Sequence, residues 1–380
     1  MSLSVSLDSI AQYFESLSDP RNDKNRLHHL TDIMVICICA VTCGATGPTA
    51  IARWAKSNAQ WLSEYLELPH GIPSRDCLRR VLIAIQPQAF QECFEAWLLS
   101  CVEPGEEGTL RMVAIDGKTC RGSHDRSQGL GPLHIVSAWA GEHGICLGQV
   151  ATEEKSNEIT AIPKLLERID LASSIVSIDA MGCQKEIVEQ IDKGKGVYVI
   201  AVKDNQPKLR DAVGDLVDTA FENAKDDLSF QVTEATERKH GRIDERSYGL
   251  IKLPRNSSIK EKWPSVKAVG YAIRYSTDSQ GKESEETRYY ILNRFIAITA
   301  FAAAVRHHWS IESMHWVLDV TFREDAQQTA ERSLADNLSW LRKFAISLLK
   351  RGMKKGESIV GRMQMSGWNT DYLEKVLTGQ

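Results

Sequence analysis

The pattern of apolar and polar positions predicts a helical region over residues 1–105. Apolar side chains recur at helical spacing in IARWAKSNAQWLSEYLEL (51–68), and Ser74 stands where it would cap the helix of SRDCLRRVLIAI (74–85). A Gln86-Pro87 break separates that helix from AFQECFEAWLL. Two closely joined helices with arginines on the first fit either a DNA-binding helix-turn-helix or an ordinary helical hairpin.

After the glycine-rich acidic stretch 103–109, the pattern changes to that of buried strands. Strands and helices then alternate, which is typical of a mixed α/β sheet whose later strands are parallel through right-handed crossovers. The predicted elements, in order, are the strand RMVAID (111–116), the hairpin LHIVSAWA (133–140) with GICLGQVA (144–151), a helix at 160–169, the strand SIVSID (174–179), a helix at 183–194 and the strand GVYVIAVK (196–203).

A polar, charged segment then interrupts the alternation, and helical periodicity returns near residue 298. At 380 residues the chain is too long for one ordinary core, so more than one domain is expected. The expected division is a helical N-terminal domain (1–105), the first part of a catalytic domain (106–206), an insertion subdomain (207–295), the last catalytic helices (296–350) and a basic C-terminal tail (351–380).

Composition is that of a soluble globular protein, with 43% hydrophobic and 25% charged residues. The longest apolar run, IMVICICAV (33–41), is too short to span a bilayer, and no secretory signal precedes it. The nine cysteines form no CxxC pair, which favours buried thiols in a reducing compartment over disulfides or zinc ligands. The sequence therefore predicts a cytoplasmic protein without a membrane partner.

The net charge of the chain is −4, but two of its segments are basic. Residues 341–363 carry seven basic side chains against one acidic, and residues 237–262 carry eight against four. Such segments are either solvated faces or DNA-contacting surfaces, and the charge pattern alone favours the first.

Asp116 and Asp179 occupy equivalent positions, because each closes a predicted buried strand and precedes a small residue. In α/β sheets, ligands bind at the carboxyl ends of strands. Two aspartates placed in this way predict a pair of metal ligands, and Mg²⁺ would require further oxygen donors.

A third carboxylate is available in VRHHWSIESMHWVLDVTF (305–322), where His308, Glu312, His315 and Asp319 follow spacings of four, three and four. These spacings place them on one helical stripe flanked by apolar residues, so the stripe is predicted to face the sheet, with Trp309 and Trp316 packing beside it. Burying such groups requires partners.

Three interpretations of this stripe compete. The four side chains could satisfy one another as a structural network, or His308, Glu312 and His315 could bind zinc, although their spacing is not that of HExxH. Alternatively, Glu312 completes a divalent-metal site with Asp116 and Asp179, and the histidines either orient the ligands or contact phosphate. Only the third interpretation accounts for both aspartates. Asp319, Glu324 and Asp325 are rival third ligands.

Taken together, these segments resemble the DDE transposases of bacterial insertion sequences, specifically the H-repeat-associated type. The similarity extends in order over nearly the whole chain. It is carried by DPRNDKNRLHHLTDI, AIDGKTCRGS, EKSNEITAIPKLLE, SIDAMGCQKEI, VKDNQ, HGRIDER, RHHWSIESMHWVLDVTFRED and NLSWLRKFAISLLK.

The resemblance implies a ribonuclease H-like mixed five-stranded sheet flanked by helices, with an inserted subdomain and an all-helical N-terminal domain. It assigns the catalytic and metal-binding triad to Asp116, Asp179 and Glu312. Two Mg²⁺ ions, or Mn²⁺ in their place, would support hydrolysis at a transposon end and attack of the freed 3′-hydroxyl on target DNA. A structure-selective nuclease and an inactive domesticated DNA-binding protein are the alternatives.

The expected partner is double-stranded DNA, with terminal inverted repeats read by the N-terminal domain and a homodimer or larger assembly formed on the DNA. The side chains expected to orient the ligands are His315 and Asp319. The candidates for phosphate contact are Lys118, Lys203, Arg242, Arg306 and His308.

Overall fold

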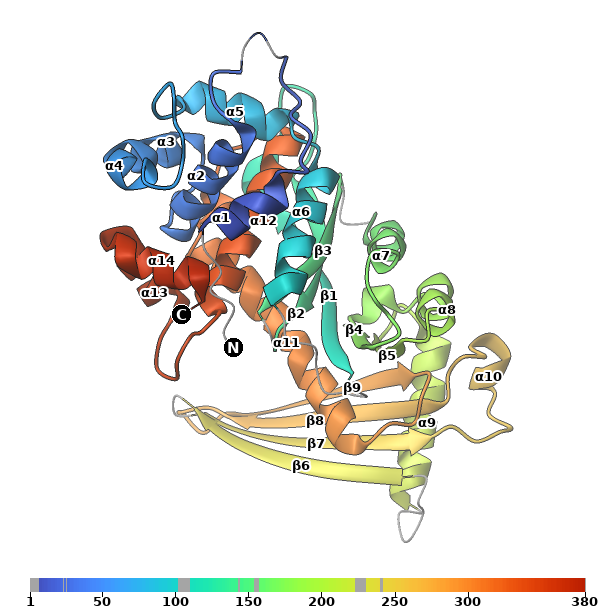
Figure 1. Ribbon diagram of the computed structural model, residues 1–380. Coiled ribbons are helices and arrows are strands. Elements are labelled where there is room, and N and C mark those ends of the chain that lie inside the picture. The colour runs from blue at the N-terminus through green and yellow to red at the C-terminus, as the bar shows by residue number, and fades with distance from the viewer. Residues whose placement is uncertain are drawn as a thin grey trace. The chain divides into compact units, whose positions relative to one another are not determined.

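The structure is a computed structural model that describes residues 7–22, 24, 26–101, 110–142, 144–153, 157–222, 230–239 and 242–379 (Figure 1). The chain divides into two compact units, each built from separate stretches of sequence. The first unit contains Met1–Gly105, Gly117–Lys155 and Ser313–Gln380, and the second contains Glu106–Asp116 and Ser156–Glu312. Strand β1 (Arg111–Cys120) and helix α11 (Ile298–Val320) each have residues in both units.

The predicted helical N-terminal region is confirmed. Ser74 caps its helix as expected, because its Oγ accepts a hydrogen bond from the backbone N–H of Cys77 at 3.2 Å. The helices of this region are α1 (Leu7–Phe14), α2 (Leu30–Thr42), α3 (Pro48–Ser57), α4 (Ala59–Leu62), α5 (Arg75–Ala84) and α6 (Pro87–Cys101).

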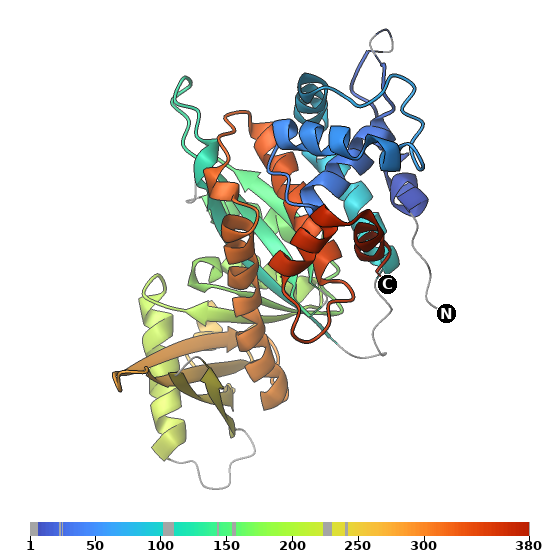
Figure 2. The ribbon, with the colours of Figure 1, turned by 90° about the vertical axis from the view of Figure 1, so that its left-hand side faces the viewer.

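Helix α12 (Arg332–Lys350) packs against α2, α5 and α6 and is buried along most of its length. Asn337 is fully buried, and its Nδ2 donates hydrogen bonds to the carbonyl oxygens of Leu82 and Ile85, which ties the end of α5 to α12. The C-terminal residues are not an extended tail: they form α13 (Ile359–Trp368) and α14 (Thr370–Thr378), which pack against α12 (Figure 2).

The hairpin predicted at 133–151 is also confirmed. Strands β2 (Leu133–Ala140) and β3 (Ile145–Thr152) pair antiparallel, with a register shift between Ala138 and Trp139. Helix α12 contacts both strands. The first unit is therefore a helical layer packed on one β-hairpin.

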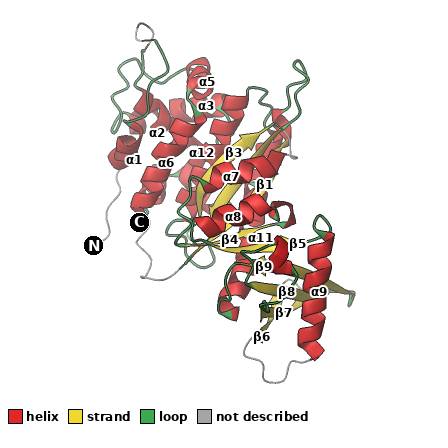
Figure 3. Ribbon diagram, turned by 90° about the vertical axis from the view of Figure 1, so that its right-hand side faces the viewer, coloured by secondary structure: helices red, strands yellow, loops and turns green. Residues whose placement is uncertain are grey.

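The second unit holds the predicted parallel strands. Strand β1 pairs with β4 (Ser174–Ile178), and β4 pairs with β5 (Val197–Val202), both in parallel. Every residue of β4 and β5 is buried, as expected for the centre of a parallel sheet. Helices α7 (Glu158–Leu166) and α8 (Lys185–Lys193) form the crossovers; they pack against each other, and α8 packs against β5 (Figure 3).

The segment predicted as an insertion adds to this sheet. It contains α9 (Pro207–Glu222), α10 (Ile259–Lys262) and the strands β6 (Phe230–Lys239), β7 (Arg242–Lys252), β8 (Ala268–Thr277) and β9 (Glu283–Leu292). Within the unit the strand order is β1-β4-β5-β9-β8-β7-β6. The predicted mixed sheet flanked by helices is thus confirmed, and the four strands of the inserted segment extend it beyond β5. Because β9 pairs antiparallel with β5, the otherwise open edge of β5 is covered.

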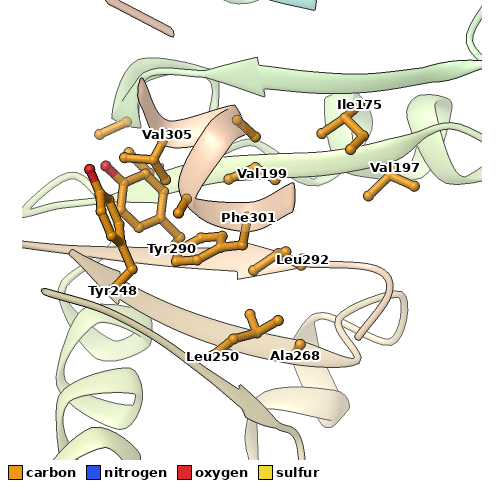
Figure 4. Close-up of a cluster of buried hydrophobic side chains, with 14 residues drawn as sticks. Ile175, Val197, Val199, Tyr248, Leu250, Ala268, Tyr290, Leu292, Phe301 and Val305 are labelled. Carbon is orange, nitrogen blue, oxygen red and sulfur yellow. The ribbon is translucent and has the colours of Figure 1, made fainter. Parts of the chain in front are cut away.

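The two faces of the inserted strands are covered by different helices. Side chains alternate between faces along a strand, so Tyr289 and its neighbour Tyr290 point in opposite directions. Tyr289 faces α9, where its hydroxyl lies beside Gly214, whereas the Tyr290 ring lies 5.5 Å from that of Phe301 on α11. Figure 4 shows Phe301 and Val305 packed over Tyr290 and beside Val199 of β5.

The structure bears on two predictions, those about membrane-spanning helices and about the cysteines. Among the residues that the structure describes, no helix has the length and apolar character needed to cross a membrane. Eight of the cysteines have side chains that the structure describes, and all eight have free thiols. Six of these are buried, in keeping with their prediction as small apolar side chains.

Candidate active site

The sheet register brings the two predicted aspartates together. Ile115 of β1 pairs with Ile178 of β4, so Asp116 and Asp179 follow as neighbours on adjacent parallel strands. One detail of the prediction is wrong, because β1 does not end at Asp116 and continues to Cys120. The physical reason lies in the second half of the strand, where buried Cys120 packs in a cluster with Leu133 and Ile135 of β2.

Asp179 is held by the turn that follows β4. Its Oδ1 accepts hydrogen bonds from the backbone N–H groups of Met181 at 3.0 Å and Gly182 at 3.4 Å. A Cβ on Gly182 would lie 2.3 Å from Ile178 Cγ2, so only glycine allows the turn to fold back onto the strand. Burial, together with the neighbouring carboxylate of Glu158, raises the pKa of Asp179. This aspartate is therefore in a site where its negative charge is poorly stabilised by the protein alone.

The VKDNQ stretch at the end of β5 holds the same turn through two side chains. Asn205 Nδ2 donates to the carbonyl oxygen of Ala180 at 2.6 Å, and Gln206 Nε2 donates to that of Cys183 at 3.0 Å. Two side chains thus hold the loop that carries Asp179. Lys203, two residues before Asn205, lines the same cavity as Asp179.

That cavity collects the predicted catalytic residues of the second unit. It has a volume of about 230 Å³ and is lined by carboxylates from β1, the β4 turn and α11, by two cations and by aromatic and aliphatic side chains. Its lining residues are Asp116, Ser177, Ile178, Asp179, Ala180, Val199, Ala201, Lys203, Arg288, Tyr290, Val305, His308, Trp309 and Glu312. The three predicted triad members therefore border one polar cavity.

His308 is tied to the sheet beside this cavity. Its Nδ1 lies 3.2 Å from the Ser177 hydroxyl, and burial lowers the pKa of His308 to about 4. The imidazole is therefore neutral near pH 7 and carries no charge that would attract a phosphate. This favours the interpretation in which His308 orients the site.

The predicted stripe on α11 does not face one continuous core. Glu312 is exposed, and Trp316 is 59% exposed, so the prediction that Trp316 packs beside the stripe is wrong. The helix has 23 residues, and those beyond Glu312 belong to the first unit. A periodicity that assumes one buried face along the whole helix cannot describe a helix whose halves belong to different units. His315 and Asp319 therefore belong to the first unit, whereas His308 and Glu312 belong to the second.

Asp319 belongs to a buried ion-pair network in the first unit. The Lys118 Nζ lies 2.7 Å from Asp319 Oδ1, 3.0 Å from Glu324 Oε2 and 3.1 Å from Asp325 Oδ1. Although burial opposes it, Glu324 and Asp319 raise the pKa of Lys118. Lys118 was predicted to contact DNA phosphate, but its side chain is 10% exposed and its ammonium already engages three carboxylates. The rival third ligands Asp319, Glu324 and Asp325 are the partners of this lysine.

The remaining predicted residues lie in different surroundings. Burial and the nearby lysines lower the pKa of His315 to about 3, so it is neutral within the first unit. Arg306 on α11 forms an ion pair with Glu237 of β6. Arg242 begins β7, and its side chain lies outside the part that the structure describes.

Part of the basic segment 341–363 is less exposed than either interpretation assumed. In residues 341–363, the side chains of Arg342, Lys343 and Arg362 are buried. Lys343 Nζ contacts Ser137 Oγ at 2.7 Å and Gln149 Oε1 at 2.5 Å. These cations hold the first unit together and are neither solvated nor available to DNA.

Two residues of the site were not singled out as polar contacts from the sequence: Arg288 on β9 and the ring of Trp309. The Trp309 ring lies 5.0 Å from the guanidinium carbon of Arg246, 5.5 Å from that of Arg274 and 5.9 Å from that of Arg288. Burial opposes the charge of Arg288, but Glu286, Tyr290 and Glu312 raise its pKa. The sequence did offer one signal: Arg288 and Tyr290 are two residues apart, so on a strand their side chains share one face.

The metal-ligand prediction concerns the carboxylates that border this cavity. Within the described ranges, no group of three or more histidine, cysteine, aspartate or glutamate side chains is arranged to hold a metal ion as it stands. This holds for the zinc set of His308, Glu312 and His315 and equally for the set of Asp116, Asp179 and Glu312. The donors of the cavity are nevertheless the carboxylate oxygens that Mg²⁺ prefers, and Asp179 would gain from a neighbouring cation.

Comparison with known proteins adds to this geometry. The family described as "Transposase DDE domain" matches residues 107–348, and the family described as "DDE_Tnp_1-associated" matches residues 11–98. The protein named "Putative transposase YncI" from Escherichia coli O157:H7 is 37% identical over 380 residues, covering 98% of this chain and 95% of that protein. "H repeat-associated putative transposase YhhI" from Escherichia coli strain K12 is 34% identical over 380 residues, covering 99% of each chain.

A shorter relative bears a different name. "Inactive transposase YbfQ" from Escherichia coli strain K12 is 30% identical over 78 residues, which covers 20% of this chain and 93% of that protein.

Proposed function

The chain belongs to the transposase DDE domain family, and we propose that it cuts DNA at the ends of its element and joins the freed 3′-hydroxyl to target DNA. The observation that carries this proposal is the shared cavity of Asp116, Asp179 and Glu312, which come from two neighbouring parallel strands and one helix. Three carboxylates bordering a cavity with Lys203 suit a reaction at a phosphodiester.

Asp116, Asp179 and Glu312 would hold divalent cations, with Mg²⁺ as the expected ion and Mn²⁺ as a substitute. When bound, such ions lower the pKa of water and stabilise charge on the attacking and leaving oxygens. Both hydrogen bonds that fix Asp179 use Oδ1, which leaves Oδ2 for a ligand. Glu312 is exposed on its helix, so its side chain can change rotamer at little cost.

The other groups of the cavity would position the DNA and the carboxylates. Lys203 supplies a positive charge for a phosphate oxygen, at the end of the strand that neighbours β4. The neutral His308, bonded to Ser177, fixes α11 against β4 and so sets where Glu312 enters. Asn205 and Gln206 hold the turn of Asp179.

Recognition of the DNA ends is assigned to the helical N-terminal region. Its helix α5 presents Arg75 and Arg80 to solvent, and residues 11–98 match the family associated with the DDE domain. Exposed arginines on a helix can contact phosphates and base edges. Binding by this region would be independent of the chemistry in the second unit.

The test uses duplexes of the inverted repeats that border the gene. Glu312→Gln should abolish Mg²⁺- or Mn²⁺-dependent end cleavage, because the amide supplies one weak ligand oxygen in place of a carboxylate. The dissociation constant for DNA, measured by gel shift without metal, should stay within about threefold of the wild-type value, because Glu312 is not expected to contact a phosphate. Glu261→Gln, an exposed glutamate on α10, is the matched control and should cleave like the wild type. A Glu312→Gln variant that still cuts would falsify the triad.

Joining is tested separately from cutting. Duplexes that already end in the free 3′-hydroxyl are incubated with a supercoiled plasmid and Mg²⁺, and labelled plasmid is the product of joining. A protein that cuts ends but never joins them is a nuclease, and one that binds ends without metal-dependent chemistry is an inactive relative. Either result contradicts the proposed function.

A further inference from the structure

The inserted strands present a row of arginines to the face that α11 covers. In the register, Tyr248 pairs with Ala272 and Ala272 with Arg288, which places Arg288 on the same face as the buried Tyr248. Two residues along, Arg246 pairs with Arg274. Because side chains two apart share a face, all three arginines lie on the side of α11. All three guanidiniums lie within cation–π distance of the indole ring of Trp309 on α11.

These arginines differ in how fully other groups of the insertion neutralise them. Arg246 is 8% exposed and pairs with both Glu237, at 2.8 Å, and Asp244, at 3.2 Å. Arg274 pairs with Asp244, which offers it both carboxylate oxygens. Guanidiniums paired in this way hold neighbouring strands together, and of these two only Arg246 is buried, since Arg274 is 25% exposed.

Arg288 is placed differently from the other two. Its ion pair with Glu286 is made through Nε at 2.7 Å, and the Tyr290 hydroxyl also forms a hydrogen bond with its side chain, which is 30% exposed. It also borders two cavities at once. One is the carboxylate cavity of Asp116, Asp179 and Glu312, and the other, of about 30 Å³, is closed by Trp309, Tyr248 and Tyr290.

Figure 4 shows Tyr248 and Tyr290 side by side, with both hydroxyl groups pointing the same way. These phenols, the Trp309 ring, Arg246 and Arg274 line the small cavity together with the Arg288 side chain. A guanidinium held over an aromatic face loses little further freedom when it binds an anion. The arginine is therefore supported from one side and open to the carboxylate cavity on the other.

We propose that Arg288 is a substrate-binding residue of the active site, and that its terminal guanidinium nitrogens bind a phosphate of the DNA strand that lies over Asp116, Asp179 and Glu312. The inference rests on the proposed function and extends it by making the inserted sheet part of the active site. A cavity bordered by three carboxylates repels a phosphodiester, and Arg288 offers a planar pair of donors that matches two phosphate oxygens.

The experiment compares Arg288→Ala and Arg288→Lys with the wild type in single-turnover cleavage of the inverted-repeat duplexes with Mg²⁺. Arg288→Ala should cleave on the order of 10²-fold more slowly, a loss typical of removing one donor from a developing anion. Arg288→Lys should recover only part of the rate, because an ammonium lacks the two-pronged geometry. Arg255→Ala, an exposed arginine between β7 and α10, is the matched control and should cleave normally.

A second arm separates phosphate binding from support of the fold. The wild type and Arg288→Ala are tested on duplexes in which one phosphate near the cut is replaced by a neutral methylphosphonate. If Arg288 binds one phosphate, replacing that phosphate should lower the cleavage rate of the wild type by the same factor as Arg288→Ala does. The same replacement should not lower the cleavage rate of Arg288→Ala any further. A variant that is slowed by the same factor at every position would show that Arg288 acts only through the fold.

The outcomes distinguish the inference from the function beneath it. If the wild type makes no metal-dependent cut, the proposed function fails and the inference with it. If the wild type cuts and Arg288→Ala cuts equally fast, the inference alone is overturned. Glu286→Gln removes the ion-pair partner but keeps the arginine, and under the proposal it retains most of the cleavage rate.

Discussion

Replacing Glu324 by glutamine tests the buried ion-pair network of the first unit. Its side chain is 2% exposed, with Oε1 at 3.2 Å from Arg342 Nη1 and Oε2 at 3.0 Å from Lys118 Nζ. Glu324→Gln keeps the shape of the side chain and removes its charge, so both cations lose a buried anionic partner. Breaking such a network by removing one partner costs ~3–5 kcal/mol of the free energy of unfolding.

The pKa of Glu324 gives a second route to this magnitude. Burial opposes the charged form, yet Lys118, Arg342 and Lys343 lower the pKa of Glu324 from its ordinary 4.5 to about 2. Each unit corresponds to about 1.4 kcal/mol, so the shift corresponds to about 3 kcal/mol. Because the folded-state pKa lies below the ordinary value, this stability is present above pH 4.5 and is lost as pH falls toward 2.

The assay is urea unfolding followed by tryptophan fluorescence, at pH 7 and at steps below pH 5. At pH 7, Glu324→Gln should lower the free energy of unfolding by about 3 kcal/mol, and the difference should narrow as the wild-type carboxylate is protonated. Glu331→Gln is the matched control: its side chain is 54% exposed and 3.8 Å from Arg79, so the change should stay within about 0.5 kcal/mol. A Glu324→Gln loss under about 1 kcal/mol, or one unchanged in acid, would refute the reasoning.

Three further predictions follow from the second unit. Folding lowers the pKa of His308 to about 4, so its contribution to stability is present above pH 6.5 and lost as pH falls toward 4; His308→Asn should flatten this part of the stability curve measured in urea. Asn205→Ala loses the hydrogen bond to Ala180 and should slow single-turnover cleavage about tenfold or more, because the Asp179 turn is released. Gly182→Ala should lower the free energy of unfolding by ~1–3 kcal/mol, since its Cβ would meet Ile178, whereas Gly131→Ala, in open space, should not.

The parts of the fold that the sequence predicted are those in which local pattern and topology agree. Periodicity predicts the helices of the N-terminal region and the hairpin of β2 and β3. The preference for serine at the start of a helix predicts that Ser74 caps α5. Asp116 and Asp179 were placed by a topological rule, because carboxylates that follow neighbouring parallel strands must lie close together. Neither step needs knowledge of distant contacts.

The errors arose where one element has residues in both units. Periodicity along α11 predicted a single buried stripe, but Glu312 and Trp316 are exposed, and Asp319 pairs with Lys118 in the first unit. Strand β1 continues past Asp116 for a similar reason, since Cys120 packs with residues of β2. Sequence spacing describes the geometry of a helix or strand, but not which part of the molecule covers each half of it.

Arg288 shows a different limit. Its place beside the carboxylates depends on β9 pairing with β5, on the register that aligns it with Ala272 and Tyr248, and on α11 covering that face. None of these is a local property, and a charged residue on an alternating strand is by default expected to face water. The same pairing that closes the open edge of β5 also delivers a cation to the cavity. An insertion paired in this way with β5 cannot change its register without changing the cavity, because shifting β9 by one residue would turn Arg288 away from α11 and bring Tyr289 into its place.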